Sequence, residues 1–493
     1  MKSTMLVGVL LASFAAAASA QTPDPAAQRK AMLERALSAE LPGAWTPPPV
    51  VPASHFAAVT AQRLCSAIFI AGMAPAAARQ TLGDNNALAS AAQRMKAGEP
   101  VVDRRLREVR VKAADGPVRT ARQVGSQGCV ILAEQGAPLR FRPSIVPPRS
   151  DATAPWPLGD RLPARPAEID PARVEAALAA AFAPEEALTQ AVVVTWRGQL
   201  IGERYGLGAT ASTPLEGWSM GKSVVATLLG RLIAEGAYTL DQPAPIPQWS
   251  APGDPRAAIR IRDILNMSSG LRLRAEQDPE YAADGRLPDH WYLYSAPDAF
   301  TYAATRPLQW APGTIGRYRN TDPVLASYLV RLAVEKRGDN YHAFPQRALF
   351  DPLGIRSAVL ETDASGNFLT QGAELMSGRD WARLGNLYLA DGMWNGKRLL
   401  PEGFARFVAT PAPAWVADGR PNYGGFFWLN TDKNFPIPVD AYFMAGAGGQ
   451  YTIVIPSHDL VVVRIGRYAG TRPGSESLGR ALTLLMAAVP VRP

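Results

Sequence analysis

Residues 217–229 read GWSMGKSVVATLL and contain the chain's only Ser-x-x-Lys sequence. The apolar run at the end of this stretch predicts a helix, and residues three apart lie on one helical face. We therefore expect the amine of Lys222 to reach the hydroxyl of Ser219, as in an activated nucleophile. Burial is expected to lower the pKa of Lys222, so that a neutral amine accepts the serine proton. A solvated lysine beside a helix-capping serine is the alternative.

A second candidate segment is Tyr318-Arg319-Asn320, which precedes a predicted helix over residues 323–334. A tyrosine beside a lysine cation is expected to have a lowered phenol pKa, and it would act as the base or as the acid for a leaving group. Asn320 is expected to orient the substrate or Lys222. The alternative is a tyrosine in a turn followed by a capping asparagine.

A third candidate segment, Gly446-Ala447-Gly448-Gly449-Gln450, leads into a predicted strand over residues 450–456. Gly448 and Gly449 would let a ligand lie against the strand. The backbone N–H groups of Ser219 and Gln450 are then candidate donors to an oxyanion, with the N-terminus of the Ser219 helix favouring the negative charge. A flexible glycine loop is the alternative.

Together, in this order, the three segments resemble the β-lactamase and penicillin-binding-protein superfamily of serine hydrolases. They are most similar to class C β-lactamases, related esterases and 6-aminohexanoate-dimer hydrolase. Residues 262–271, 379–385, 392–396 and 449–463 are also similar to the family, and the resemblance covers about residues 168–490. It implies an α/β sandwich with a helical lobe.

The resemblance also implies roles for single residues. Ser219 would be the acylated nucleophile, Lys222 and Tyr318 would share the proton transfers, and the N–H groups of Ser219 and Gln450 would form the oxyanion hole. One position departs from the family, because many relatives carry Lys or His where this chain has Ala447. That cation suits a substrate carboxylate, so its absence favours esters or linear amides over penicillins.

Hydrophobic patterning predicts the architecture independently of the resemblance. Residues 171–182 predict a helix and residues 191–205 a hairpin, while residues 450–466 predict a second hairpin and residues 476–488 a helix. We expect one antiparallel sheet built from both ends, with both helices on one face, and a mostly helical lobe from residues 207–440. The fold class is α/β (α+β).

Prolines and glycines mark turns and segment boundaries, and their positions predict the organisation of the whole chain. A helix near residues 57–71 and strands near 106–111, 118–124 and 128–132 predict a small α+β unit in the first third. The predicted parts are a signal peptide (1–20), an extended lead-in (21–54), a small N-terminal α+β domain (55–145), a proline-rich linker (146–167) and the hydrolase-like domain (168–493).

The N-terminal pattern is typical of a secretory signal peptide. Lys2 precedes an apolar stretch over residues 5–18, and Ala18-Ser19-Ala20 fits a cleavage site that leaves Gln21 as the first mature residue. The alternative is a membrane anchor, for which the apolar stretch is short. We therefore expect a periplasmic or secreted protein.

The chain has two cysteines, Cys65 and Cys129. In an oxidising compartment, two cysteines in one small unit predict a disulfide that ties the helix near residues 57–71 to a strand. Two buried free thiols are the alternative.

Composition limits the classes of function. The chain has 493 residues, of which 47% are hydrophobic and 19% charged, as in packed globular proteins. Its formal net charge of +8 is scattered, so we expect no nucleic-acid partner. The four histidines are not spaced as ligands, so we expect no metal and no cofactor. No later stretch is apolar enough for an integral membrane segment in the mature chain.

These observations favour an exported serine hydrolase that cleaves a small ester, amide or peptide-like substrate through an acyl-enzyme on Ser219, with Lys222 and Tyr318 as acid and base. A β-lactamase or D-alanyl-D-alanine carboxypeptidase is the first alternative. A catalytically silent binding protein of the cell envelope is an alternative of another class.

Overall fold

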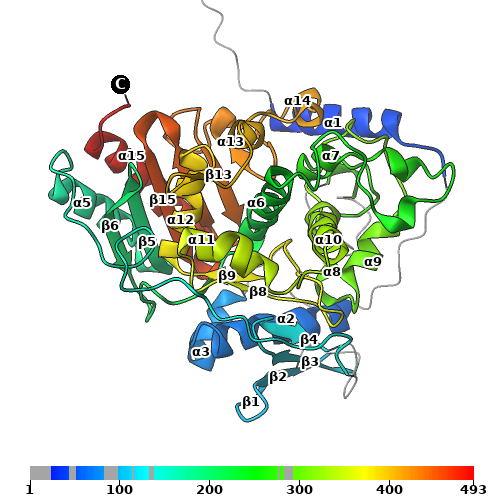
Figure 1. The fold of residues 1–493 in the computed structure, drawn as a ribbon, viewed down its shortest axis with the longest axis horizontal. Helices are drawn as coiled ribbons and strands as arrows, with labels where there is room; N and C mark the ends of the chain where they lie inside the picture. Colours follow the sequence, from blue (N-terminus) through cyan, green and yellow to red (C-terminus); the bar gives the residue numbers. More distant parts are fainter. Residues whose placement is uncertain are drawn as a thin grey trace, which may run out of the picture.

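The computed structural model describes residues 24–43, 52–82, 98–113, 116–132, 138–275, 278–281 and 292–492. Its largest sheet has six strands in the order β12-β13-β14-β15-β5-β6, all antiparallel to their neighbours (Figure 1). The two predicted hairpins meet where β15 pairs with β5, so the sheet is built from both ends, as predicted. Its strands are β5 (Thr189–Trp196), β6 (Gln199–Tyr205), β12 (Trp428–Leu429), β13 (Tyr442–Gly446), β14 (Gln450–Ile455) and β15 (Leu460–Gly466).

One face of this sheet is covered by α5 (Pro171–Ala181) and α15 (Thr471–Ala488). Successive strand residues point to opposite faces. Val192 and Val194 of β5 therefore pack with apolar residues of these two helices, while Val193 packs in the core on the other face. The placement of both helices on one face confirms the prediction from the sequence.

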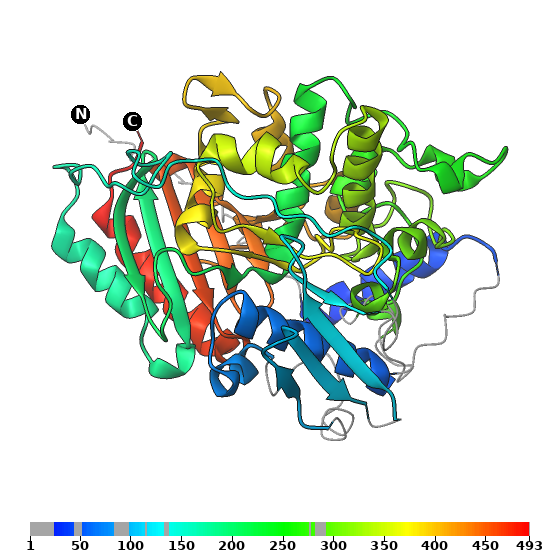
Figure 2. The ribbon, with the colours of Figure 1, turned by 60° about the horizontal axis from the view of Figure 1, so that its bottom comes forward.

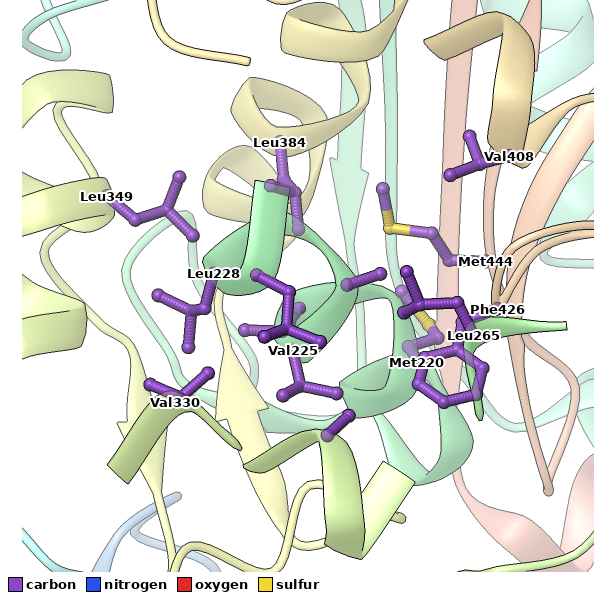
Figure 3. Close-up of a cluster of buried hydrophobic side chains, with 14 of the residues drawn as sticks. Met220, Val225, Leu228, Leu265, Val330, Leu349, Leu384, Val408, Phe426 and Met444 are labelled. Atoms are coloured by element: carbon purple, nitrogen blue, oxygen red, sulfur yellow. The ribbon is translucent and has the colours of Figure 1, made fainter. Parts of the chain in front are cut away.

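The other face carries the main hydrophobic core, with α12 (Gly378–Leu389) against the sheet and α6 (Gly221–Ala234) behind it. Figure 3 shows Val225 and Leu228 of α6 in the same buried cluster as Leu384 of α12. Most residues of α6 are buried, because neighbouring elements surround it. This packing fixes the helix that follows the Ser-x-x-Lys serine.

The segment between β6 and β12 forms a lobe that is mainly helical, as expected, and also contains two small sheets. β7, β8 and β9 form one of them, with β9 in the middle, and β10 and β11 form the other. The elements of the lobe, besides α6 and α12, are β7 (Leu215–Glu216), α7 (Ile261–Leu265), α8 (Tyr292–Ser295), α9 (Ala299–Ala304), α10 (Thr321–Lys336), α11 (Asp351–Leu353), β8 (Val359–Leu360), β9 (Glu374–Met376), β10 (Met393–Trp394), β11 (Lys397–Arg398), α13 (Phe404–Val408) and α14 (Pro413–Ala417).

A separate small sheet, with strands in the order β1-β2-β3-β4, lies at the bottom of Figure 1. α2 packs on it, and the disulfide Cys65–Cys129 joins α2 to β4, as predicted. We call this part the N-terminal unit. Its elements are α2 (Pro52–Phe69), α3 (Pro75–Ala78), β1 (Val101–Asp103), β2 (Glu108–Lys112), β3 (Val118–Gln123) and β4 (Cys129–Ile131).

The prediction of an extended lead-in is wrong for α1 (Pro25–Ala39). Asp24 accepts a hydrogen bond from the Ala26 N–H, and Pro25 occupies the first turn, so the segment has a regular helix start. The helix docks on the lobe, where the Trp310 indole donates to the Ala36 carbonyl. The helix was not recognised in this proline-rich part of the sequence, because contacts with distant parts of the chain support it.

The proline-rich segment that follows the N-terminal unit packs against the larger part of the molecule. The indole of Trp156 donates to the Gly198 carbonyl, and Arg383 donates to the Pro157 carbonyl. Among the helices that the structure describes, none is long and apolar enough to cross a membrane. The predicted signal peptide, residues 1–20, lies outside the described residues.

Candidate active site

Ser219 lies in a short 3₁₀ turn, Trp218–Met220, directly before α6. β13 approaches this turn closely. A Cβ placed on Gly446, the last residue of β13, would lie 2.0 Å from the Gly217 carbonyl oxygen. Trp218 has a φ of 51°, in the left-handed region that a residue with a Cβ rarely adopts. The serine is therefore held at a helix start by a constrained backbone beside the end of a strand.

Lys222 is close to Ser219, as expected from the i, i+3 spacing. Its Nζ lies 2.8 Å from Ser219 Oγ and donates to the Gln371 carbonyl at 2.5 Å. Lys222 is 1% exposed, and burial lowers its pKa to about 7, although the nearby Glu374 carboxyl opposes the shift. A neutral amine is therefore available near neutral pH.

Tyr318 completes this group. Its hydroxyl is hydrogen-bonded to Ser219, and the ring centroid lies 4.8 Å from Lys222 Nζ. Burial raises the pKa of Tyr318 well above its ordinary value, so the prediction of a lowered phenol pKa is wrong. The desolvation cost of a phenolate outweighs any help from Lys222, which is itself driven towards the neutral amine. Tyr318 is thus a phenol suited to donate a proton.

The glycine segment forms a tight turn between β13 and β14, with φ of 87° at Gly448 and 74° at Gly449. The Gln450 side chain points into the sheet, where its Oε1 accepts from the Gly466 N–H and its Nε2 donates to the Gly466 carbonyl. Ala447 packs against the cluster of Phe56 and Trp218. This packing places the glycine segment beside the residue that precedes Ser219.

Asn320 is buried at the N-cap of α10, where its side chain makes no capping hydrogen bond. Asn320 thus lies two residues after Tyr318 in the chain, but it does not cap the helix, which was the alternative considered from the sequence. Within the part of the chain that the structure describes, no group of three or more His, Cys, Asp or Glu residues is arranged to hold a metal ion.

Three groups at the site were missed from the sequence. The Gln371 carbonyl orients Lys222, and a backbone group leaves no sequence signature. Glu374 accepts a hydrogen bond at 2.8 Å from the N–H of Gly221, two residues after Ser219. Arg63 reaches the site from the N-terminal unit. In the sequence, Glu374 and Arg63 each stand as a single charged residue within a largely apolar segment, and this was the signal available for them.

Comparisons with known proteins give one family match. The sequence profile of the beta-lactamase family matches residues 177–483, which is more than half of the chain. No curated protein matches the chain by sequence.

Several solved structures are similar. A family VIII carboxylesterase is 15% identical with a TM-score of 0.50, covering 65% of this chain and 99% of its own. The hydrolase EstCE1, described as having promiscuous acyltransferase activity, is 14% identical with a TM-score of 0.50, over 63% and 97%. A penicillin-binding protein homologue from Caulobacter crescentus is 14% identical with a TM-score of 0.48, over 65% and 99%. The first two share the fold of this chain.

Proposed function

The chain belongs to the beta-lactamase family, and on this premise we propose that it is a serine hydrolase that cleaves an ester or a linear amide through an acyl-enzyme on Ser219. The observation that carries the proposal is the 2.8 Å contact between Lys222 Nζ and Ser219 Oγ. Because the pKa of Lys222 is about 7, roughly half of the amine is neutral at that pH and can accept a proton.

Acylation follows from these positions. Neutral Lys222 takes the proton of Ser219 while Oγ forms a bond to the substrate carbonyl carbon, whose π electrons move onto the oxygen. The N–H groups of Ser219 and Gln450 are the proposed donors to this oxyanion. The close approach of Gly446 to Gly217 supports that assignment, since it brings the start of β14 near the nucleophile turn.

Collapse of the tetrahedral intermediate expels the leaving group. The oxyanion electrons re-form the carbonyl, the bond to the leaving oxygen or nitrogen breaks, and the leaving atom takes a proton from the Tyr318 phenol. Lys222 then passes the proton that it took from Ser219 to the Tyr318 phenolate. Lys222 and Tyr318 are both hydrogen-bonded to Ser219 in the structure, so they lie close together. Water hydrolyses the remaining acyl-enzyme and restores Ser219.

The surroundings of Ala447 support esters or linear amides over penicillins. Ala447 packs on Trp218 and Phe56, so this position offers no cation to a substrate carboxylate. Arg464 lies behind the glycine segment, but it is fully buried and donates to the carbonyls of Gly449 and Ala187. That guanidinium is therefore committed to the protein itself.

A substrate panel tests the proposal. We expect purified wild-type protein to turn over p-nitrophenyl esters or linear amides and to leave nitrocefin intact, and Ser219→Ala to be inactive. Rapid nitrocefin turnover would show the β-lactamase alternative instead. Absence of turnover and of covalent labelling throughout the panel would leave the binding-protein alternative.

We also propose that the protein is exported. The support is the N-terminal signal pattern together with the Cys65–Cys129 disulfide, a bond that persists in oxidising compartments. Cell fractionation followed by N-terminal mass analysis is expected to find a chain that begins at Gln21 in the periplasm or medium. An uncleaved chain in the cytoplasm would contradict export.

A further inference from the structure

The N-terminal unit inserts one charged side chain beneath the nucleophile turn. α2 packs on its own four-stranded sheet and also contacts α8 of the lobe, and Figure 2 shows the unit docked below the main sheet and the lobe. Arg63, on α2, is 1% exposed. Its guanidinium forms a buried ion pair with Glu216, three residues before Ser219.

Arg63 also clamps the strained residue next to the nucleophile. Its guanidinium carbon lies 4.2 Å from the ring centroid of Trp218, in a cation–π contact. The φ of 51° at Trp218 persists only if the surroundings hold it, since the left-handed region disfavours a residue with a Cβ. Phe56 and Tyr468 pack on other parts of Trp218.

The same side chain reaches the group that orients Lys222. Arg63 donates to the Gly372 carbonyl at 2.6 Å, and the neighbouring residue, Gln371, supplies the carbonyl that accepts from Lys222. One guanidinium therefore contacts two side chains of the segment that carries the serine, Glu216 and Trp218, and a backbone carbonyl of the segment that holds the lysine.

α2 has independent attachments that bring Arg63 to this position. The disulfide joins Cys65 to Cys129 on β4. The Glu361 carboxylate of the lobe accepts from both Ser66 Oγ, at 2.6 Å, and the Cys129 N–H, at 2.9 Å. The helix is thus tied to its own sheet and to the lobe within a few residues of Arg63.

We propose that Arg63 is a positioning residue, through which the N-terminal unit sets the acylation geometry of Ser219 and Lys222. The proposal rests on the proposed function, because it concerns the rate at which Ser219 is acylated. Arg63 is buried, and its hydrogen bonds and ring contact go to Glu216, Gly372 and Trp218, so it acts on the reacting groups through these neighbours. Its loss should therefore slow acylation and lower kcat/KM, which reports the steps up to acylation.

The test measures acylation per folded site in the full-length protein. A fluorophosphonate probe gives the rate constant of Ser219 labelling and, at its end point, the number of competent sites. Arg63→Met is expected to label about 10²-fold more slowly, because small displacements of reacting groups cost that much, while the end point stays complete. Arg63→Lys keeps the charge but cannot both stack on Trp218 and reach Gly372, and is expected to label about tenfold more slowly.

Arg467→Met is the matched control. Arg467 also crosses from the larger part of the molecule to the N-terminal unit, where it donates to Gln80, and its other hydrogen bond goes to the Leu207 carbonyl, not to Gly372. Its labelling rate is expected to equal that of wild type.

The outcomes separate the two proposals. Wild-type rates for both Arg63 variants, whatever their melting temperatures, would overturn the positioning role. If Arg63→Met does not fold, a wild-type rate for Arg63→Lys is enough to overturn it. Equal slowing by Arg467→Met would also overturn it, since general loosening of the interface would then explain the effect. Failure of wild type to label at Ser219 would instead refute the proposed function.

Discussion

At the scale of single residues, the proposed chemistry depends on a lysine that the protein keeps out of water. Lys222 gains one hydrogen-bond acceptor in the Gln371 carbonyl and one partner in Ser219, and the nearby Glu374 carboxyl offsets only part of the effect of burial. Burial without a contacting carboxylate disfavours the ammonium. A lysine that is ordinarily a permanent cation is thereby available as a base.

The pH dependence of acylation follows from this shift. Below a pKa of about 7, Lys222 carries a proton and cannot accept that of Ser219, so the rate should rise with pH through about 7 and then level off. Stopped-flow measurement of kcat/KM for a p-nitrophenyl ester between pH 5 and pH 9 checks the prediction. A rate that still rises steeply between pH 8 and pH 9 would show that Lys222 titrates as an ordinary lysine.

Tyr318→Phe separates the proton donor from the packing of the ring. The ring lies 5.3 Å from Trp428 and 5.8 Å from Tyr423, contacts that phenylalanine keeps, so the melting temperature should change little. We expect a loss of about 10² to 10⁴-fold for alkyl esters or amides, whose leaving groups need a proton, and a smaller loss for p-nitrophenyl esters. Equal losses for both classes would exclude Tyr318 as the donor to the leaving group.

At the scale of elements, the site depends on how closely β13 approaches the nucleophile turn. Gly446→Ala would place a methyl group 2.0 Å from the Gly217 carbonyl oxygen, so one of the two segments must move. We expect kcat/KM to fall by about 10²-fold, because the oxyanion donors and Ser219 would lose their alignment.

Gly479→Ala is the control for that substitution. Gly479 lies within α15, where an added Cβ meets nothing within 4 Å, so we expect unchanged activity and a gain of up to about 1 kcal/mol in stability. Ester hydrolysis and thermal unfolding measured on both variants compare them. Full activity in Gly446→Ala would show that the close approach is not needed.

The disulfide is the covalent link within the N-terminal unit, and it closes a loop with a sequence separation of 64 residues. Replacing both Cys65 and Cys129 by alanine is expected to destabilise the unit by about 2–5 kcal/mol. Calorimetry of the double variant and of wild type, under non-reducing conditions, measures the change. Identical melting temperatures would show that the bridge adds no stability.

At the scale of the whole molecule, the sequence predicted the elements whose hydrophobic residues form a clear local pattern. The apolar runs of β5 and β15 were readable because a strand covered on both faces buries all of its side chains. α1 was missed, since its helix is weakly amphipathic and its docking partner, Trp310, lies far away in the chain. Such support appears only in the folded molecule.

The candidate site shows the same division. Ser219, Lys222, Tyr318 and the glycine segment follow a spacing that the family pattern makes visible, and the structure brings them together. The carbonyl of Gln371 has no sequence signature. Arg63 belongs to the N-terminal unit, outside the matched residues 177–483, so neither pattern nor family predicts its contact with Trp218.

The central claim is that Ser219 is the nucleophile of a hydrolase, and covalent labelling tests it most directly. A fluorophosphonate probe is incubated with the full-length protein, and peptide mass spectrometry locates the adduct. The expected result is one adduct, on the side chain of Ser219. We expect no labelling of Ser219→Ala and slow labelling of Lys222→Ala. An adduct on another residue, or equal labelling of wild type and Ser219→Ala, would contradict the claim.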